Sequence, residues 1–425
     1  MGIIKAGMWD KMQYIFRNYY DRMMHTCLHY NGNLNKEALI EAYTIIVTKV
    51  PILRSKYVAN PIKPYWKITP HVNADNFFSF VEVSDLEIAS DTFLNTCFPA
   101  QSEYQIRVML ARCGDKDTLC TLVNHMCFDG SDLKYFNNKL AECYNNIVTK
   151  NIHTVDIKGG DRSDMQLYNS MPDEDKKSAK KLYRNASIVK EKVQFPYDGV
   201  SSKDRHMIVK RKISAEFFRK LKAVGKQNNA TINDIVLAAY YRSFYSINKM
   251  NSDEALSIAS MIDLRRHINT KATAGLTNMT GLFMCRLEHL GKDMSETITR
   301  VREALGNIKG DKFIGLYGPP LLRLAFNIFP NIIAENCIKI GYSNPLLGMS
   351  NIGIIDDKAL IMGGVGLLDA FMTGATKYKP YIQLAFTTFR DEITFTVAVK
   401  ANNNDRRTIE RFLTGIETEL QNFIG

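Results

Sequence analysis

The sequence predicts an α/β protein of two similar halves, each a mixed sheet flanked by helices. Strand and helix patterns alternate along its 425 residues, without the roughly 20–50-residue period of a repeat protein. Apolar residues make up 45% and charged residues 23%, which excludes a disordered chain, a fibre and a small disulfide scaffold. A polar, basic stretch separates the halves. We expect an N-terminal lobe over 1–175, a basic linker over 176–204 and a C-terminal lobe over 205–425.

The first half contains a helix and then a strand–turn–helix unit. Asn35 is a suitable N-cap for an apolar helix pattern that ends at Pro51. Residues 118–124 form an apolar run typical of a buried strand, and Asp129-Gly130 predicts a tight turn after it. Ser131 is expected to cap the next helix, whose apolar positions recur at helical spacing.

The second half is expected to begin with two helices and to end with another. Residues 214–227 and 231–248 carry helical patterns, and Thr231 with Asp234 three residues later predicts a capping box. A last amphipathic helix is expected after Asp405.

The strands of the second half are indicated by short apolar runs and by alternation. Residues 256–262 predict a strand that ends at the charged segment 263–267. Residues 382–389 and 393–399 alternate apolar and polar side chains on either side of a charged turn, which predicts a hairpin.

The positive charge of the chain is local. Lys and Arg number 55 against 44 Asp and Glu, a net charge of +11. Residues 176–222 alone hold 15 basic and 4 acidic residues, so the rest of the chain is neutral. The densest cluster, Lys210-Arg211-Lys212, has no interleaved aromatic residue and no helix-turn-helix frame, so nucleic-acid binding is not expected.

Several other classes of protein and site are not favoured. Eight cysteines form no CxxC pair and the start lacks an apolar secretory leader, so we expect reduced thiols in a cytoplasmic protein. The apolar region 313–333 is interrupted by Arg323 and two prolines, so no stable membrane insertion is expected. His25 and His29 have metal-like spacing without the Glu of HExxH, and no metal site is predicted.

The most informative segment for chemistry runs from Val123 to Gly130. His125 stands at the end of the expected strand, where a rigid element can hold it facing a cleft. An imidazole with a pKa of roughly 6.5 suits proton removal from a hydroxyl or amine near neutral pH. By residue type alone, a satisfied structural histidine is the simpler interpretation of His125, and an Asp129 that serves the turn is the simpler interpretation of the acidic residue. Cys127 has no adjacent base and is not favoured as a nucleophile.

The pattern HxxxDG in this setting resembles the chloramphenicol acetyltransferase-like superfamily, which includes condensation domains, alcohol acetyltransferases and wax ester synthases. Further segments fall in the family's order over roughly residues 8–424. They are similar to the family's first strand and helix, its "hPxLR" turn, the helix that opens the second half, its "PVDLR" strand and its "SNxG" segment: 30–39, 50–54, 229–239, 260–265 and 349–353.

The resemblance implies a role for each matching position. His125 would be the general base, and Asp129 would be structural and paired with an arginine, for which Arg265 is the candidate. Gly130 would keep the backbone close to a tunnel between two acetyltransferase-like lobes. The side chains of Ser350 or Asn351 could donate a hydrogen bond to the oxyanion, although they could also only shape a loop.

The implied activity is acyl transfer from a thioester to an alcohol or amine by a free-standing enzyme. The donor partner would be acyl-CoA or an acyl or peptidyl carrier protein, with the CoA or phosphopantetheine thioester as co-substrate and no tightly bound cofactor. Asn124 replaces the first of the two histidines usual in condensation domains, and the DFGWG motif of the plant BAHD branch is absent. The alternative is a non-catalytic, condensation-like domain that docks a carrier protein.

The basic segment has two readings under this resemblance. CoA and carrier proteins are anionic, so Lys210, Arg211 and Lys212 are candidates for donor docking near the join of the lobes. A solvated basic surface is the simpler explanation.

Overall fold

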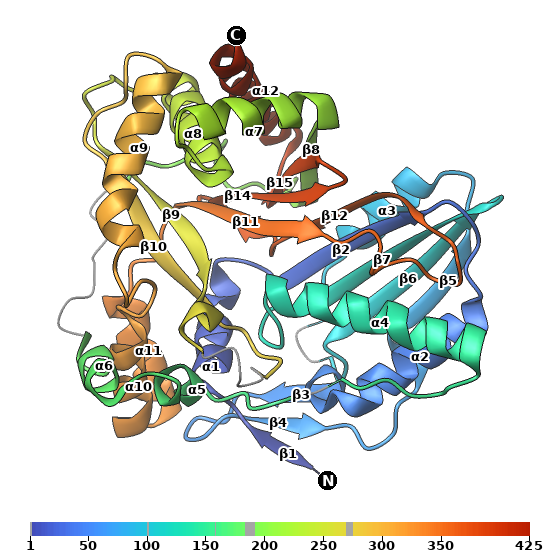
Figure 1. Ribbon diagram of the computed structural model, residues 1–425. Coiled ribbons are helices and arrows are strands. Elements are labelled where there is room, and N and C mark those ends of the chain that lie inside the picture. Colours follow the sequence, from blue (N-terminus) through green and yellow to red (C-terminus); the bar gives the residue numbers. More distant parts are fainter. Residues whose placement is uncertain (1, 100–101, 158, 183–191, 269–274) are drawn as a thin grey trace.

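The N-terminal lobe is built on a five-stranded sheet in the order β12-β2-β7-β6-β5 (Figure 1). The computed structural model describes every residue except 1, 100–101, 158, 183–191 and 269–274. β5 and β6 run parallel, whereas the other neighbouring pairs are antiparallel, so the sheet is mixed. The strands are β2 (Met23–Tyr30), β5 (Phe78–Glu82), β6 (Ile106–Cys113), β7 (Lys116–Asn124) and β12 (Leu367–Thr373).

Helices cover both faces of this sheet. α2 (Lys36–Lys49) and α4 (Gly130–Lys150) pack together on one face, and α3 (Leu86–Leu94) contacts β6 and β7 on the other. Asn35 caps α2 as expected, because its side chain accepts a hydrogen bond from Ala38 N at 2.9 Å. The apolar sides of α2, α4 and the sheet form one continuous buried core.

A small three-stranded sheet lies along the lower edge of Figure 1, and a short helix lies above it, to the left of α4. The strand order is β1-β4-β3, all antiparallel. The elements are β1 (Ile3–Lys5), α1 (Met8–Ile15), β3 (Ser55–Val58) and β4 (Tyr65–Ile68). Trp66 Nε1 donates to Asp10 Oδ2 at 3.0 Å, which joins β4 to α1.

The C-terminal lobe contains a second mixed sheet, in which β8 and β13 both pair with β15 and the remaining order is β10-β9-β11-β14-β15. Its strands are β8 (Arg205–Ile213), β9 (Leu256–Asp263), β10 (Thr280–Leu287), β11 (Leu347–Ile355), β13 (Lys377–Tyr378), β14 (Ile382–Phe389) and β15 (Glu392–Ala401). The expected hairpin is present, since β14 and β15 pair across a turn in which Arg390 and Asp391 have φ of 47° and 63°. Two successive positive φ values match the twist of a two-residue hairpin.

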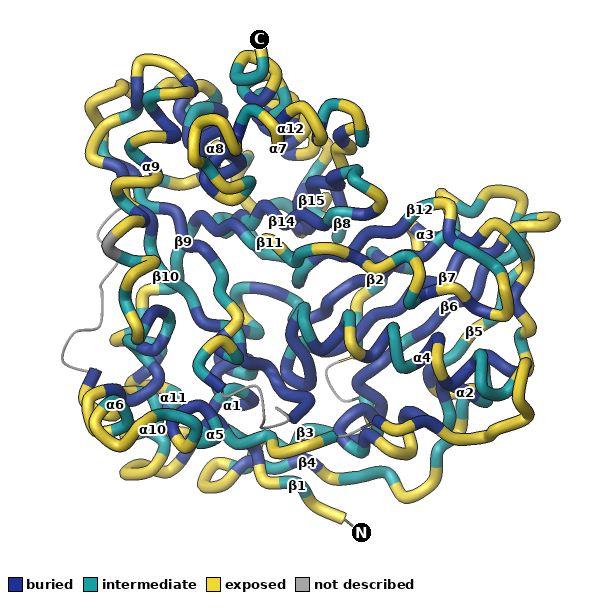
Figure 2. The backbone as a smooth tube through the Cα atoms, in the orientation of Figure 1, coloured by how far each residue is buried: buried dark blue, intermediate teal, exposed yellow. Residues whose placement is uncertain are grey.

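The helices of the C-terminal lobe bury their apolar faces above this sheet, and their outer sides are exposed (Figure 2). The predicted capping box at Thr231 and Asp234 is confirmed. The helices are α7 (Ala215–Gln227), α8 (Ile232–Asn248), α9 (Met294–Lys309) and α12 (Asn403–Ile424). Four further helices lie together at the lower left of Figure 1: α5 (Met165–Asn169), α6 (Asp173–Ala179), α10 (Pro319–Ile328) and α11 (Asn331–Gly341).

The two halves of the chain are interleaved. β8 begins at Arg205, where the C-terminal lobe was expected to begin, but β12 leaves the second half to pair with β2 of the first. A shared apolar cluster joins the lobes, with Met23 of the N-terminal sheet packed among residues such as Ile208 and Ala398. The division at 204–205 is therefore incomplete, and part of the expected linker, 183–191, lies outside the described residues.

The predicted α/β class with mixed, helix-flanked sheets is confirmed, whereas the tunnel between the lobes stays a prediction. One local expectation was wrong. Asp129, rather than Ser131, caps α4, because its carboxylate accepts hydrogen bonds from the backbone N–H groups of Ser131 and Asp132. Across the described residues, no helix has both the length and the apolar character needed to cross a bilayer.

Candidate functional site

His125 lies directly after β7, in the turn that leads into α4. Its backbone N–H donates to Arg22 O at 2.7 Å, so the start of β2 fixes the position of the turn. The residue is only partly buried, although the residues on both sides of it are buried. His125 is therefore more accessible than the packed residues on either side of it.

The hydrogen bonds of the His125 ring determine its tautomer. Nδ1 lies 2.8 Å from the carbonyl oxygen of Phe128. A carbonyl only accepts hydrogen bonds, so the tautomer that satisfies this contact carries the proton on Nδ1 and holds the free electron pair on Nε2. Asn278 Nδ2 lies 3.0 Å from both Nδ1 and the carbonyl oxygen of His125, and it can donate to the latter. No hydrogen bond to Nε2 is formed by the described residues, which leaves this atom available as a base.

The surroundings of His125 keep it neutral. Burial lowers its pKa below the ordinary value of 6.5, and the positive charge of Lys377 acts in the same direction. The Phe128 carbonyl and the Asp129 carboxylate oppose the shift without cancelling it. At neutral pH the side chain is therefore an uncharged imidazole that can accept a proton.

Asp129 is fully engaged in holding the turn. Oδ1 caps α4, and Oδ2 accepts hydrogen bonds from Met279 N at 2.8 Å and from Arg265 Nη1 at 2.7 Å. The structure thus brings Arg265 and Asp129 together, the pairing that the sequence resemblance implied. A carboxylate with this many donors has no free position from which to exchange protons with His125.

Arg265 joins the lobes at this point. It follows β9 in the C-terminal lobe and also contacts Asp132 Oδ1 at 2.8 Å and Asp263 Oδ1 at 3.1 Å. A second link connects the lobes here, because Ser131 Oγ donates to Asp263 Oδ2 at 2.7 Å. The three carboxylates raise the pKa of Arg265, whereas burial and the nearby Asp129 raise that of Asp132 well above its usual value.

Arg162 and Asn278, which sequence reasoning did not identify, also hold the turn. Arg162 donates to the carbonyl oxygens of Met126 at 3.0 Å and Cys127 at 2.9 Å, and its charge is paired with Asp10 at 2.6 Å. Asn278 is fully buried and holds the His125 carbonyl. Both lie far from His125 in the sequence, and no local motif signals their contacts.

Asn124 has a structural function where condensation domains usually have their first histidine. Its Nδ2 donates to Gln105 Oε1 at 2.7 Å, and its Oδ1 accepts from Met126 N at 3.0 Å. The side chain thereby closes the turn around His125. The absence of a histidine at position 124 consequently removes no group from the reactive side of His125.

The model of the condensation domain family matches residues 7–318, which is most of the chain. The chain belongs to the condensation domain family. No curated protein sequence matches it significantly. Membership of the family supports acyl transfer or condensation as the general activity.

Solved structures share the fold of this condensation-family protein at low sequence identity. The trichothecene 15-O-acetyltransferase from Fusarium sporotrichioides has a TM-score of 0.71 and 13% identity, covering 99% of this chain and 95% of that one. The epimerization domain from the third module of tyrocidine synthetase B has a TM-score of 0.69 and 15% identity, covering 100% and 97%. The first condensation domain of the calcium-dependent antibiotic synthetase, with a bound substrate analogue, has a TM-score of 0.69 and 14% identity, covering 100% and 96%.

The remaining candidates from the condensation-family resemblance lie on or beside β11. A Cβ atom on Gly130 would lie 3.3 Å from Ile352 Cγ2, so the glycine allows α4 and β11 to approach closely. Asn351 is partly committed elsewhere, because it donates to Asn233 Oδ1 at 2.8 Å and accepts from Gly353 N at 2.9 Å. These bonds use only one of the two Nδ2 hydrogens of Asn351, so its expected oxyanion role, like that of Ser350, stays a prediction.

The three basic residues expected to dock the donor lie on β8, and each is paired with a carboxylate. Lys210 contacts Glu87 at 2.6 Å, Arg211 contacts Glu417, and Lys212 contacts Asp369 at 2.9 Å and Glu392 at 2.6 Å. These pairs neutralise the cluster. The cluster is therefore less positive than the sequence alone indicates, and donor docking at these three positions stays a prediction.

Proposed function

We propose that this protein transfers an acyl group from a thioester to a hydroxyl or amine, with His125 as the general base. The observation that carries the proposal is the hydrogen bond from His125 Nδ1 to the Phe128 carbonyl. This bond directs the basic Nε2 away from the turn, while burial keeps the ring in the neutral form that a base requires.

The proposed reaction needs only this imidazole and oriented donors. Nε2 takes the proton of the acceptor as its oxygen or nitrogen attacks the thioester carbonyl. The tetrahedral intermediate collapses, the carbon–sulfur bond breaks, and the leaving thiolate takes the proton from Nε2. A hydrogen bond from Ser350 to the oxyanion is our proposal for the stabilising donor. Loss of such a donor typically lowers the rate by about 10²–10³-fold.

The proposed donor is the thioester of CoA or of a carrier-protein phosphopantetheine. The condensation-family assignment supports a carrier-protein partner, and the likeness to an acetyltransferase supports a CoA thioester as an equal candidate. Incubation with both donor classes and with matched alcohol and amine acceptors, followed by mass spectrometry, distinguishes them. Binding of a carrier protein without turnover on any acceptor would instead indicate a docking domain.

A further inference from the structure

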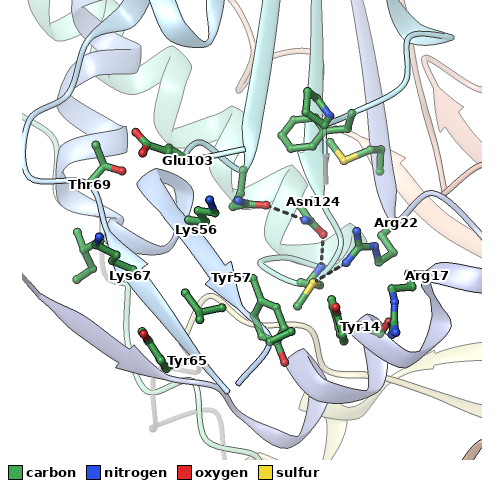
Figure 3. Close-up of a pocket in the computed structure, with 18 of the residues that line it drawn as sticks. Tyr14, Arg17, Arg22, Lys56, Tyr57, Tyr65, Lys67, Thr69, Glu103 and Asn124 are labelled. Atoms are coloured by element: carbon green, nitrogen blue, oxygen red, sulfur yellow. Dashed lines mark hydrogen bonds between the residues drawn. The ribbon is translucent and has the colours of Figure 1, made fainter. Parts of the chain in front are cut away.

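A cavity of about 790 Å³ adjoins the turn that carries His125 (Figure 3). Asn124 and Met126, the two neighbours of His125, form part of its wall. The rest comes from the segment between the end of α1 and the start of β2, from β3, β4 and the residues just after them, and from Phe98, Pro99, Glu103 and Gln105. Its volume falls within the roughly 300–1,000 Å³ typical of small-molecule sites.

Arg22 is the unusual residue of this cavity. Its guanidinium lies beside Asn124 in Figure 3, and among the described residues its side-chain hydrogen bond runs from Nη1 to the thioether of Met126 at 3.2 Å. A thioether is a weak acceptor. Arg22 Nε is buried without a hydrogen-bond partner, and no ion pair to Arg22 is formed within the described ranges.

The carboxylate of the neighbouring Asp21 acts on the charge of Arg22 but forms no ion pair with it among the described residues. Asp21 Oδ1 accepts hydrogen bonds from Met23 N and Thr376 N, both close to 3 Å, and its Oδ2 lies 3.5 Å from His206 Nδ1. Placing a charged guanidinium in a partly buried wall without a counter-charge is costly. The free donors of Arg22 therefore point to an anion that is part of a ligand.

Other cations add to the positive character of the cavity. Lys56 on β3 and Lys67 on β4 line it, and neither forms an ion pair in the part of the chain that the structure describes. Arg17 also lines the cavity, but Glu335 pairs with it at 2.9 Å. Glu103 is an exposed acidic residue at the margin.

The cavity also offers apolar and aromatic surface. The rings of Tyr14 and Tyr57 contact each other with centroids 4.8 Å apart, and Val58, Ile68 and Phe98 contribute carbon surface. The hydroxyl of Tyr57 is buried without a hydrogen-bond partner. A ligand that fits both features has an anionic group joined to an apolar or aromatic body.

We infer that this cavity is a substrate subsite that binds an oxyanion, either a carboxylate or a phosphate, through Arg22 and Lys56. The inference rests on the proposed acyl transfer, because it makes the bound anion part of one of the two substrates. It narrows the substrate class to anionic molecules with an apolar body, held next to the turn that carries the base.

Isothermal titration calorimetry on the full chain tests the subsite without any turnover. The probes are benzoate, phenyl phosphate and the uncharged benzamide. We expect benzoate, phenyl phosphate or both to bind, with an affinity that falls as salt rises, and benzamide to bind at least about tenfold more weakly than the bound anion. The two anionic probes distinguish a carboxylate site from a phosphate site. Equal binding of benzamide, or no binding of either anion, would overturn the inference.

Matched variants assign the binding to Arg22. Arg22→Met should weaken binding of the anion by about ten- to a hundredfold, whereas Arg302→Met, on an exposed part of α9, should leave it unchanged. Lys56→Met should also weaken it and serves if the Arg22 variant does not fold. Unchanged binding in folded Arg22→Met, or in Lys56→Met if the former does not fold, would contradict the assignment.

His125→Ala separates this inference from the proposed function. We expect the variant to bind the anion as the wild type does while losing acyl transfer. Transfer that survives in His125→Ala would refute the general base and leave the anion site standing. Absent anion binding, with transfer still dependent on His125, would refute the subsite alone.

Discussion

Arg265 Nη1 lies 2.7 Å from Asp129 Oδ2, although the two residues belong to different lobes and are 136 positions apart. The same guanidinium contacts Asp132 through Nη2 at 2.8 Å. The pairing holds the first turn of α4 against the end of β9. The position of His125, four residues before Asp129, therefore depends on how the two lobes fit together.

Replacing Arg265 with Met should destabilise the protein strongly. The change leaves Asp129, Asp132 and Asp263 close together without their shared cation. Removing one partner of a buried ion pair typically costs about 3–5 kcal/mol. Chemical denaturation followed by circular dichroism measures the free energy of unfolding, with Arg302→Met as the control. A loss no larger than that of the control would show that Arg265 does not hold the lobes.

Asn124→Asp tests the structural function of the position before His125. The new carboxylate can still accept from Met126 N but cannot donate to Gln105, so we expect a loss of about 1–3 kcal/mol in unfolding free energy. Adding Gln105→Glu to Asn124→Asp should not restore the lost hydrogen bond between these positions. It should instead add charge repulsion between the two carboxylates. Stability equal to the wild type in Asn124→Asp would mean that the Gln105 bond is unimportant.

The pH dependence of acyl transfer should reflect the lowered pKa of His125. A general base works in its neutral form, so kcat/KM should fall as the pH drops through that pKa. Burial lowers this pKa from 6.5, hence the acid limb of the profile should lie below pH 6.5. An acid limb above pH 6.5 would contradict the buried environment of His125.

Lys377 offers a second check on the same profile. Its buried ammonium has a pKa lowered to about 8 by burial, and its Nζ lies 3.9 Å from the centre of the Tyr20 ring. The charge of Lys377 helps to lower the pKa of His125. Lys377→Met should therefore move the acid limb to higher pH, and Lys312→Met, at an exposed ion pair with Asp175, should not. An unmoved limb in Lys377→Met would show that the two groups are not coupled.

Charge reversal on β8 should affect stability more than donor binding. Lys212→Glu would face Asp369 and Glu392 with a third negative charge, and we expect a lower Tm. The apparent KM for the thioester donor should stay unchanged because the cluster is already neutralised. A raised KM with an unaltered Tm would restore Lys210, Arg211 and Lys212 as a docking surface.

Local chemistry made much of the fold predictable. The Asn35 cap, the capping box of Thr231 and Asp234, and the hairpin before β15 each depend on residues a few positions apart. The sequence indicates Ser131 as the cap of α4, but the cap is Asp129. Both residue types suit an N-cap, and only the folded turn shows which side chain accepts the N–H groups.

The rest depends on contacts between distant segments. The crossing of β12 into the first sheet, and the hydrogen bonds of Arg162 and Asn278 around His125, follow from the way that the lobes pack. The pairing of Arg265 with Asp129 was accessible only through the family resemblance, which supplied both positions. Lys210 is paired with Glu87, which lies 123 positions away in the sequence. A local count of charged residues therefore cannot detect this pairing.

The most direct test of the account is acyl transfer by the wild type and His125→Ala, measured by mass spectrometry with acyl-CoA and acyl-carrier-protein donors and with alcohol and amine acceptors. His153→Ala, at an exposed histidine paired with Glu41, is the matched control. We predict product with the wild type and the control, and a loss of about 10²–10⁴-fold in His125→Ala. Undiminished transfer by His125→Ala would contradict the central claim.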